Sequence, residues 1–192
     1  MTKEKLYDFF ILTLRWYLIW YMFSYGWSKL TMSQFGVHDP SILEEPLKNV
    51  NSFYIAWHLY GQSYFFNIVT GLLEIVAAIL LIFNRTVLLG ALMVLAVLGN
   101  ILIIDISFTT EIYGFALPVR ILGMMLSALL ILFYYKERII SVFKIMTEGI
   151  TTKFNYQWWI FLILPIIGFL MDFVWGIILM PVRALLDSFF IS

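Results

Sequence analysis

The chain has 192 residues and no net charge, and 62% of its residues are hydrophobic while only 12% are charged, against about 25% charged residues in an ordinary soluble domain. This composition excludes a disordered chain, a nucleic-acid-binding protein and a conventional soluble enzyme. A core of this size cannot keep so much apolar surface away from water, so the surroundings of the chain must be lipid.

Five stretches are long and apolar enough to cross the hydrocarbon core of a bilayer, which is about 30 Å thick. They cover residues 9–30, 64–83, 87–104, 115–135 and 158–180. Each is predicted to be a helix, because a lipid-exposed segment must satisfy its own backbone polar groups. The sequence therefore predicts an all-α integral membrane bundle.

The first long loop and the segment after the fourth span have distinct characters. In residues 31–63, Ser41 and Glu44 fit the capping box of a short helix that Pro46 would end. The aromatic run at 53–60 favours a helix lying in the headgroup layer, and a lid over a ligand entrance is the alternative. Residues 136–157 mix basic and apolar side chains, which indicates an amphipathic cytoplasmic linker. The expected division is a bundle over 1–135, this linker, and a membrane helix within 158–192.

The distribution of Lys and Arg in the short loops predicts the orientation. With the N-terminus in the cytoplasm, seven basic residues lie inside: Lys3, Lys5, Arg85, Lys136, Arg138, Lys144 and Lys153. Only Lys29, Lys48 and Arg183 then lie outside. This bias predicts an inner-membrane protein with a cytoplasmic N-terminus and, after five spans, an extracytoplasmic C-terminus. If Pro165 and Pro181 make the last segment re-entrant, the C-terminus returns inside.

Polar residues within the spans are the candidate functional residues, because charge in hydrocarbon is costly and usually faces the bundle interior or a water-filled cavity. Most of them fall at a similar depth in the outer half, and the candidate ligand-binding residues are Lys29, Glu74, Asn100, Asp105, Arg120 and Asp172. Helical spacing places each charge among small residues, where helices approach closely: Arg15 and Lys29 with Gly26, Glu74 with Gly71 and Ala78, Arg120 with Gly123 and Ser127, and Asp172 with Gly168 and Gly176. The sequence predicts a bundle whose interior holds a polar cluster open to the outside.

Three interpretations of this cluster stay open. In the first, the cations Arg15, Lys29 and Arg120 pair with the carboxylates and fix the register of the helices, with Arg15 and Glu74 as structural members. In the second, the cluster binds a ligand with a polar head and an apolar body, such as a quinone or a lipid. In the third, Glu74 serves a proton or ion pathway.

Metal and redox chemistry based on side chains has little support in the sequence. The chain has no cysteine and two histidines, His38 and His58, so no metal site is expected. No base, nucleophile and orienting group fall at a recognisable spacing. We therefore expect a protein that is not itself an enzyme, or one that serves as a subunit of a membrane oxidoreductase, with a quinone or a bound lipid as the candidate cofactor.

Short motifs over residues 7–135 resemble the DoxX-like family of small membrane proteins. They are Arg15, the run Tyr25-Gly26-Trp27-Ser28-Lys29-Leu30, Gly71 with Glu74, Asn84-Arg85-Thr86 followed by Gly90-Ala91, and the polar pair Asn100 and Asp105. The resemblance implies a four-helix membrane bundle, and some members accompany membrane oxidoreductases, including a thiosulfate:quinone oxidoreductase. This chain departs from the pattern by its long outer loop and by its extra C-terminal membrane segment.

The leading expectation is a non-catalytic subunit or a bundle that binds a quinone-like or lipid-like ligand in a membrane redox or envelope process. A small proton-coupled transporter and a structural membrane partner are the alternatives. The expected partners are the lipid bilayer, a membrane oxidoreductase and further copies of the chain, and no nucleic acid.

Overall fold

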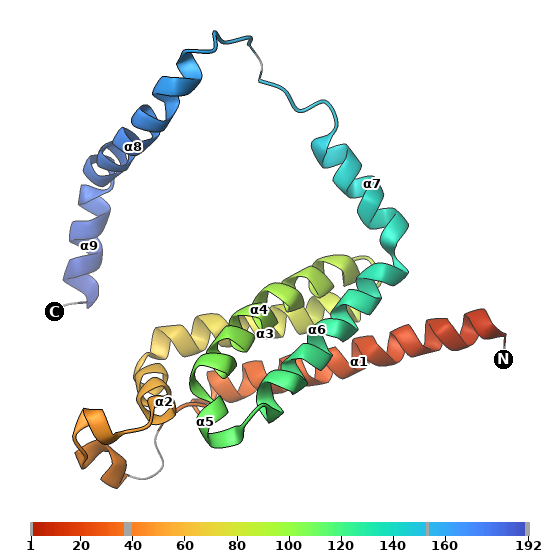
Figure 1. Cartoon of the computed structure of the whole chain (residues 1–192), viewed down its shortest axis with the longest axis vertical. Coiled ribbons are helices and arrows are strands. Elements are labelled where there is room, and N and C mark those ends of the chain that lie inside the picture. Colours follow the sequence, from red (N-terminus) through yellow and green to blue (C-terminus); the bar gives the residue numbers. More distant parts are fainter. Residues whose placement is uncertain (1, 37–39, 153, 191–192) are drawn as a thin grey trace. The chain divides into compact units, whose positions relative to one another are not determined.

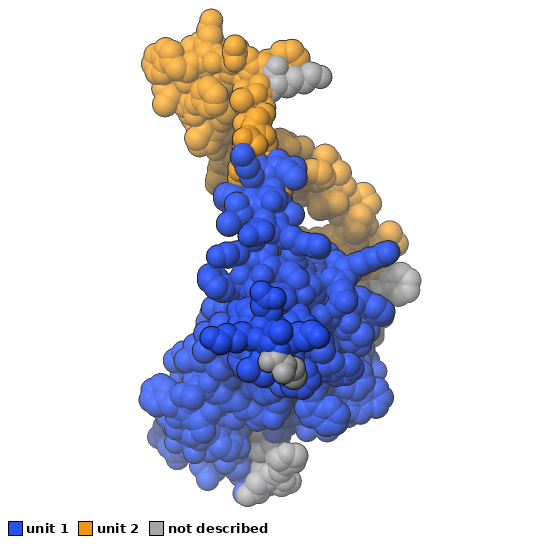
Figure 2. All heavy atoms as spheres, turned by 90° about the vertical axis from the view of Figure 1, so that its right-hand side faces the viewer, with its two compact units in different colours: residues 1–145 blue, residues 146–192 orange. Residues whose placement is uncertain are grey.

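The computed structural model describes residues 2–36, 40–152 and 154–190, and this part of the chain contains helices and turns but no strand. His38 and Lys153 lie outside the described residues. The chain divides into two compact units, residues 1–145 and 146–192, which Figure 2 shows in different colours.

The first unit is built on four long helices, α1 (Lys3–Leu30), α3 (Tyr64–Ile82), α4 (Val87–Phe108) and α6 (Ala116–Tyr134). Helix α1 packs against α3 and α6, and α4 also packs against α3 and α6, so the four helices form a closed ring. Successive helices of the ring run in opposite directions (Figure 1), as in an up-down-up-down bundle. The all-α membrane bundle expected from composition is confirmed.

Small and medium apolar side chains fill the centre of this bundle. Leu18, Ala77, Leu98 and Met124 come from the four different helices and have no exposed surface. Small residues at the contacts allow close approach, which matters in lipid because the hydrophobic effect does not drive helices together there. At one end of the bundle the Tyr134 hydroxyl donates to Asp8 Oδ1 at 2.9 Å, which joins the end of α6 to the start of α1.

Among the described residues, four helices are long and apolar enough to cross a membrane, namely α3, α4, α6 and α8 (Ile160–Ile178). Helix α1 corresponds to the first predicted span and has 28 residues, but it does not reach the same apolarity. The reason is that α1 carries Arg15, Lys29 and several Trp and Tyr residues, and its two basic side chains are buried against the rest of the bundle.

The described residues of the long loop between α1 and α3 form two 3-10 turns and a helix: η1 (Pro40–Glu44), η2 (Leu47–Asn49) and α2 (Ser52–Gln62). The predicted capping box is wrong, because Ser41 lies inside a turn that Pro40 begins. Proline is suited to a first helical position, since its φ is already fixed and its missing N–H is not needed there. The residue that caps a helix in this loop is Asn51, whose side-chain oxygen accepts from the Phe53 amide at 2.8 Å.

Helix α2 packs against α3 and α4, at the end of the bundle that also holds the short helix α5 (Thr110–Tyr113) (Figure 1). At the opposite end, α6 is followed by α7 (Lys136–Thr147), which has no buried residue. The basic and apolar residues predicted to form an amphipathic linker thus form a helix over most of that segment.

The second unit contains α8 and α9 (Met180–Phe190), which are separated by Leu179. Pro165 lies inside α8 without ending it, and Pro181 is the second residue of α9, where a proline costs little. Helix α8 is therefore continuous over 19 residues, or about 29 Å at the usual rise per residue. None of its residues is buried.

Candidate functional site

The candidate site begins where α1 and α3 come into backbone contact. A Cβ atom on Gly26 would lie 2.6 Å from the Gly71 carbonyl oxygen, and one on Gly71 would lie 2.8 Å from the Gly26 carbonyl oxygen. Only glycine fits at such an approach. The contact places the last turn of α1 directly beside the middle of α3.

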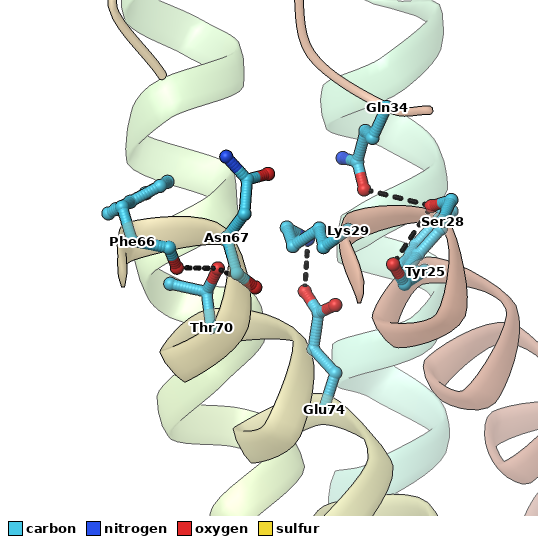
Figure 3. Close-up of polar contacts among 8 residues, drawn as sticks. All are labelled: Tyr25, Ser28, Lys29, Gln34, Phe66, Asn67, Thr70 and Glu74. Atoms are coloured by element: carbon cyan, nitrogen blue, oxygen red, sulfur yellow. Dashed lines mark hydrogen bonds and ion pairs between the residues drawn. The ribbon is translucent and has the colours of Figure 1, made fainter. Parts of the chain in front are cut away.

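This approach buries an ion pair between Lys29 and Glu74. The Nζ–Oε1 distance is 2.5 Å, and the two side chains are 4% and 1% exposed. Figure 3 shows them pointing toward one another from α1 and α3. The second carboxylate oxygen of Glu74, Oε2, is buried without a hydrogen-bond partner among the described residues. The pair neutralises both charges and leaves acceptor capacity on the carboxylate.

Arg15 has a different role from the one expected, because its partners are not carboxylates. Its guanidinium donates to the carbonyl oxygens of Leu81 at 2.7 and 3.2 Å and of Ile82 at 3.1 Å, and to Asn84 Oδ1 at 2.7 Å. These are carbonyls of the last turn of α3, which lack partners within the helix. Arg15 therefore caps α3 at the end of the bundle away from Lys29, and the predicted pairing of Arg15 with a carboxylate is wrong.

A cavity of about 540 Å³ lies between the helices beside the ion pair. Its walls are mainly apolar and come from α3, α4 and α6, among them Leu73, Ile101 and Leu117. The polar side chains that line it are Lys29, Gln34, Thr70, Glu74, Asn100, Asp105 and Arg120. Five of the six predicted ligand-binding residues thus share one cavity.

Arg120 and Asp105 lie on this cavity in contrasting environments. Arg120 is exposed, and its guanidinium carbon lies 4.5 Å from the ring centroid of Tyr21 and 5.5 Å from that of Tyr25. Asp105 is 7% exposed. Within the described part of the chain, neither side chain forms an ion pair, so each brings a charge to the cavity wall.

The face predicted for Arg120 needs correction. The buried face of α6 carries Ile121, Met124 and Ser127, whereas Arg120 and Gly123 are exposed. Helix α6 is rotated so that its bulkier apolar residues face α1 and α4. Arg120 lies at the border of this buried face.

Asp172 is not among the residues that line the cavity. It lies on α8 in the second unit and is exposed. Nothing lies within 4 Å of a Cβ built on Gly168 or Gly176. Within the second unit, the small residues around Asp172 therefore do not mark a helix contact.

Several aromatic residues that were not among the predicted site residues line part of the cavity. Tyr25, Phe35, Trp57 and Phe66 line it, and the Phe35 ring lies 5.5 Å from Trp57 and 6.1 Å from Phe66, centroid to centroid. The Gly36 amide donates to the Trp57 carbonyl at 3.1 Å, which ties the two loop segments together. The aromatic run at 53–60 was a usable signal for Trp57, but no spacing relates Phe35 to it.

Among the described residues no group of three or more His, Asp or Glu side chains could hold a metal ion. The chemistry of the cavity is instead that of an ion pair, two further charges, amides and aromatic rings inside apolar walls. Such a lining suits a molecule with a polar head and an apolar body.

The DoxX family model matches residues 10–105, which is half of the chain. The chain belongs to the DoxX family. It is 31% identical over 132 residues to the uncharacterized protein YwoB of Bacillus subtilis (strain 168), an alignment that covers 69% of this chain and 80% of YwoB. No solved structure matches the chain significantly.

The part matched by the DoxX model runs from residue 10, about two turns into α1, to Asp105 near the end of α4. It therefore includes Lys29, Glu74, Asn100 and Asp105, while Arg120 and the second unit lie beyond it. The family thus supplies most of the cavity, and α6 completes it.

Proposed function

We propose that this DoxX protein binds a lipophilic ligand with a polar headgroup, quinone-like or lipid-like, in the cavity between its four bundle helices. In this proposal it acts as a non-catalytic component of a membrane redox or envelope process. The observation that carries the proposal is the lining of the cavity, in which charged and amide side chains gather at one place on apolar walls.

The expected orientation also predicts from which side of the membrane a ligand would enter the cavity. With the N-terminus in the cytoplasm, the end of the bundle that carries α2 and α5 faces the outside. The cavity, which Trp57 of α2 helps to line, then lies in the outer half of the membrane. A ligand would enter from the outer leaflet.

The test is purification from native membranes in a mild detergent, followed by mass spectrometry of extracted small molecules. We expect a stoichiometric quinone or lipid with the unmodified protein and its loss with Arg120→Leu. Arg85→Leu is the matched control, because Arg85 is exposed in the turn before α4 and does not line the cavity. Retention of the ligand by the double variant Arg120→Leu, Asp105→Asn would show that the ligand lies elsewhere.

A proton-coupled transporter is the second candidate, and the free Oε2 of Glu74 beside the cavity favours it. A buried carboxylate with spare acceptor capacity can bind the proton that is transported together with a solute. This candidate requires flux in proteoliposomes that Glu74→Gln abolishes. Absence of flux under any imposed gradient would count against it.

A further inference from the structure

The charges that line the cavity differ in how completely the protein itself satisfies them. Lys29 and Glu74 hold each other at 2.5 Å and together add no net charge. Asp105 and Arg120 line the same cavity with opposite charges and without an ion-pair partner in the described part of the chain. This inference rests on the proposed function: the ligand that the cavity binds must complement one anion and one cation.

Arg120 is placed to receive an anionic oxygen. Its guanidinium carbon lies 4.5 Å from the ring centroid of Tyr21 and 5.5 Å from that of Tyr25, and within the described residues the group forms no ion pair. A guanidinium presents its N–H donors as a fork that fits the oxygens of a phosphate or carboxylate. The tyrosine rings also hold the group in place, which lowers the entropy lost on binding.

Asp105 requires a donor. The residue is 7% exposed, and a buried carboxylate without hydrogen bonds is strongly disfavoured. Lys29 attracts it, but the Lys29 ammonium is already bonded to Glu74. The nearby threonine does not supply the donor, because the Thr109 hydroxyl donates to the backbone carbonyl of Asp105. A ligand ammonium, which brings N–H donors and the opposite charge together, is the partner that fits this carboxylate.

We propose that the cavity recognises a zwitterionic headgroup that carries a primary ammonium and a phosphodiester, as in phosphatidylethanolamine. The phosphodiester binds Arg120, the ammonium binds Asp105, and the first part of the acyl chains lies on the apolar wall of Leu73, Ile101 and Leu117. An oxidised quinone offers only acceptors, so it satisfies Arg120 and leaves Asp105 without a partner. A quinol offers O–H donors but no positive charge for the carboxylate. A quaternary ammonium has no N–H to donate to the carboxylate.

The experiment uses the full chain, delipidated in mild detergent, with four added probes: phosphatidylethanolamine, phosphatidylcholine, phosphatidylglycerol and a ubiquinone. Native mass spectrometry measures the bound fraction, and the melting temperature reports stabilisation of the fold. We expect phosphatidylethanolamine to bind at least about tenfold more tightly than the other three, because one charge-assisted hydrogen bond separates them.

The variants assign the two ends of the headgroup. Asp105→Asn should weaken binding of phosphatidylethanolamine about tenfold and leave the weaker binding of phosphatidylglycerol unchanged, because only the former has an ammonium. Arg120→Leu should weaken both. Glu137→Gln and Arg85→Leu are the controls, since both residues are exposed and neither lines the cavity. The comparison of lipids on the unmodified chain remains decisive if a variant does not fold.

The outcomes separate this inference from the proposed function. Preference for ubiquinone, or equal binding of the three phospholipids, overturns the zwitterionic headgroup and leaves a lipophilic-ligand protein. Binding of none of the four probes, with no ligand from native membranes, overturns both.

Discussion

Lys29 and Arg15 are two cations on the same helix face that have unlike partners. Arg15 offers a planar fork, and it binds two carbonyls and an amide oxygen at the end of α3. Lys29 offers a compact ammonium, and it binds one carboxylate oxygen. The difference follows the chemistry of the two groups, because guanidinium satisfies several acceptors at once while ammonium acts as a point charge.

The Lys29–Glu74 pair gives a prediction at the residue scale. Removing one partner, by Lys29→Met or Glu74→Leu, leaves the other charge buried and should lower the free energy of unfolding by about 3–5 kcal/mol. The double variant should lose much less, since no charge is then left in the bundle. Denaturant titration in detergent micelles, evaluated as a double-mutant cycle, measures both. If the stability lost by the double variant equalled the sum of the losses of the two single variants, the pairing would be contradicted.

At the element scale, the contact between α1 and α3 is set by two glycines that face each other. Because the Gly26 backbone meets the Gly71 carbonyl, the two helices approach more closely here than larger side chains would permit. Because α1 and α3 are antiparallel, Lys29 and Glu74 come from opposite sides of this contact, and a Cβ on Gly26 would lie 3.2 Å from Glu74 Cβ. The ion pair therefore bridges the contact and depends on it for its short distance.

Gly26→Ala should therefore separate α1 from α3 and lower stability by about 1–3 kcal/mol, the range for an overpacked contact. Ligand binding should fall as well, because the separation moves Lys29 away from Glu74. Gly123→Ala is the matched control, since nothing lies within 4 Å of a Cβ there and alanine favours helix over glycine. Melting temperatures of the two variants in the same detergent provide the test, and a smaller loss for Gly26→Ala than for Gly123→Ala would contradict it.

At the scale of the whole molecule, the up-down-up-down ring places the long loop between α1 and α3 and the α4–α6 connection at one end and the α3–α4 turn and α7 at the other (Figure 1). The cavity with its charged residues belongs to the end with the long loop. The basic residues Arg85, Lys136 and Arg138 lie at the opposite end. This segregation is what the positive-inside rule associates with a cytoplasmic side.

The expected orientation can be tested by labelling introduced cysteines, because the chain has none of its own. Asn49→Cys, Glu137→Cys and Ser188→Cys replace exposed residues and leave every Lys and Arg in place. A membrane-impermeant maleimide should label Asn49→Cys in intact cells and Glu137→Cys only after permeabilisation. Labelling of Ser188→Cys from outside would place α8 across the membrane, whereas labelling of Glu137→Cys from outside would refute a cytoplasmic N-terminus.

Much of the fold follows from local sequence. The span predicted at 64–83 is helical over Tyr64–Ile82, and the one at 115–135 over Ala116–Tyr134. The third helix continues to Phe108 rather than ending at 104, because polar Asp105 is accommodated at the cavity instead of terminating the span. The small-residue faces of α1 and α3 were also predictable, since helical spacing alone places Gly26 beside Lys29 and Gly71 beside Glu74.

The amino-acid sequence by itself determined that this is a helical membrane protein with charges held inside its bundle, because apolarity, helix length and helical spacing are local properties. Only the tertiary structure decided which charges meet. Arg15 and Lys29 lie on one face of α1, and either could have been the partner of Glu74 until the contact of Gly26 with Gly71 set the register of α1 against α3. The rotation of α6 and the position of Phe35 likewise depend on packing between distant segments, which no local pattern encodes.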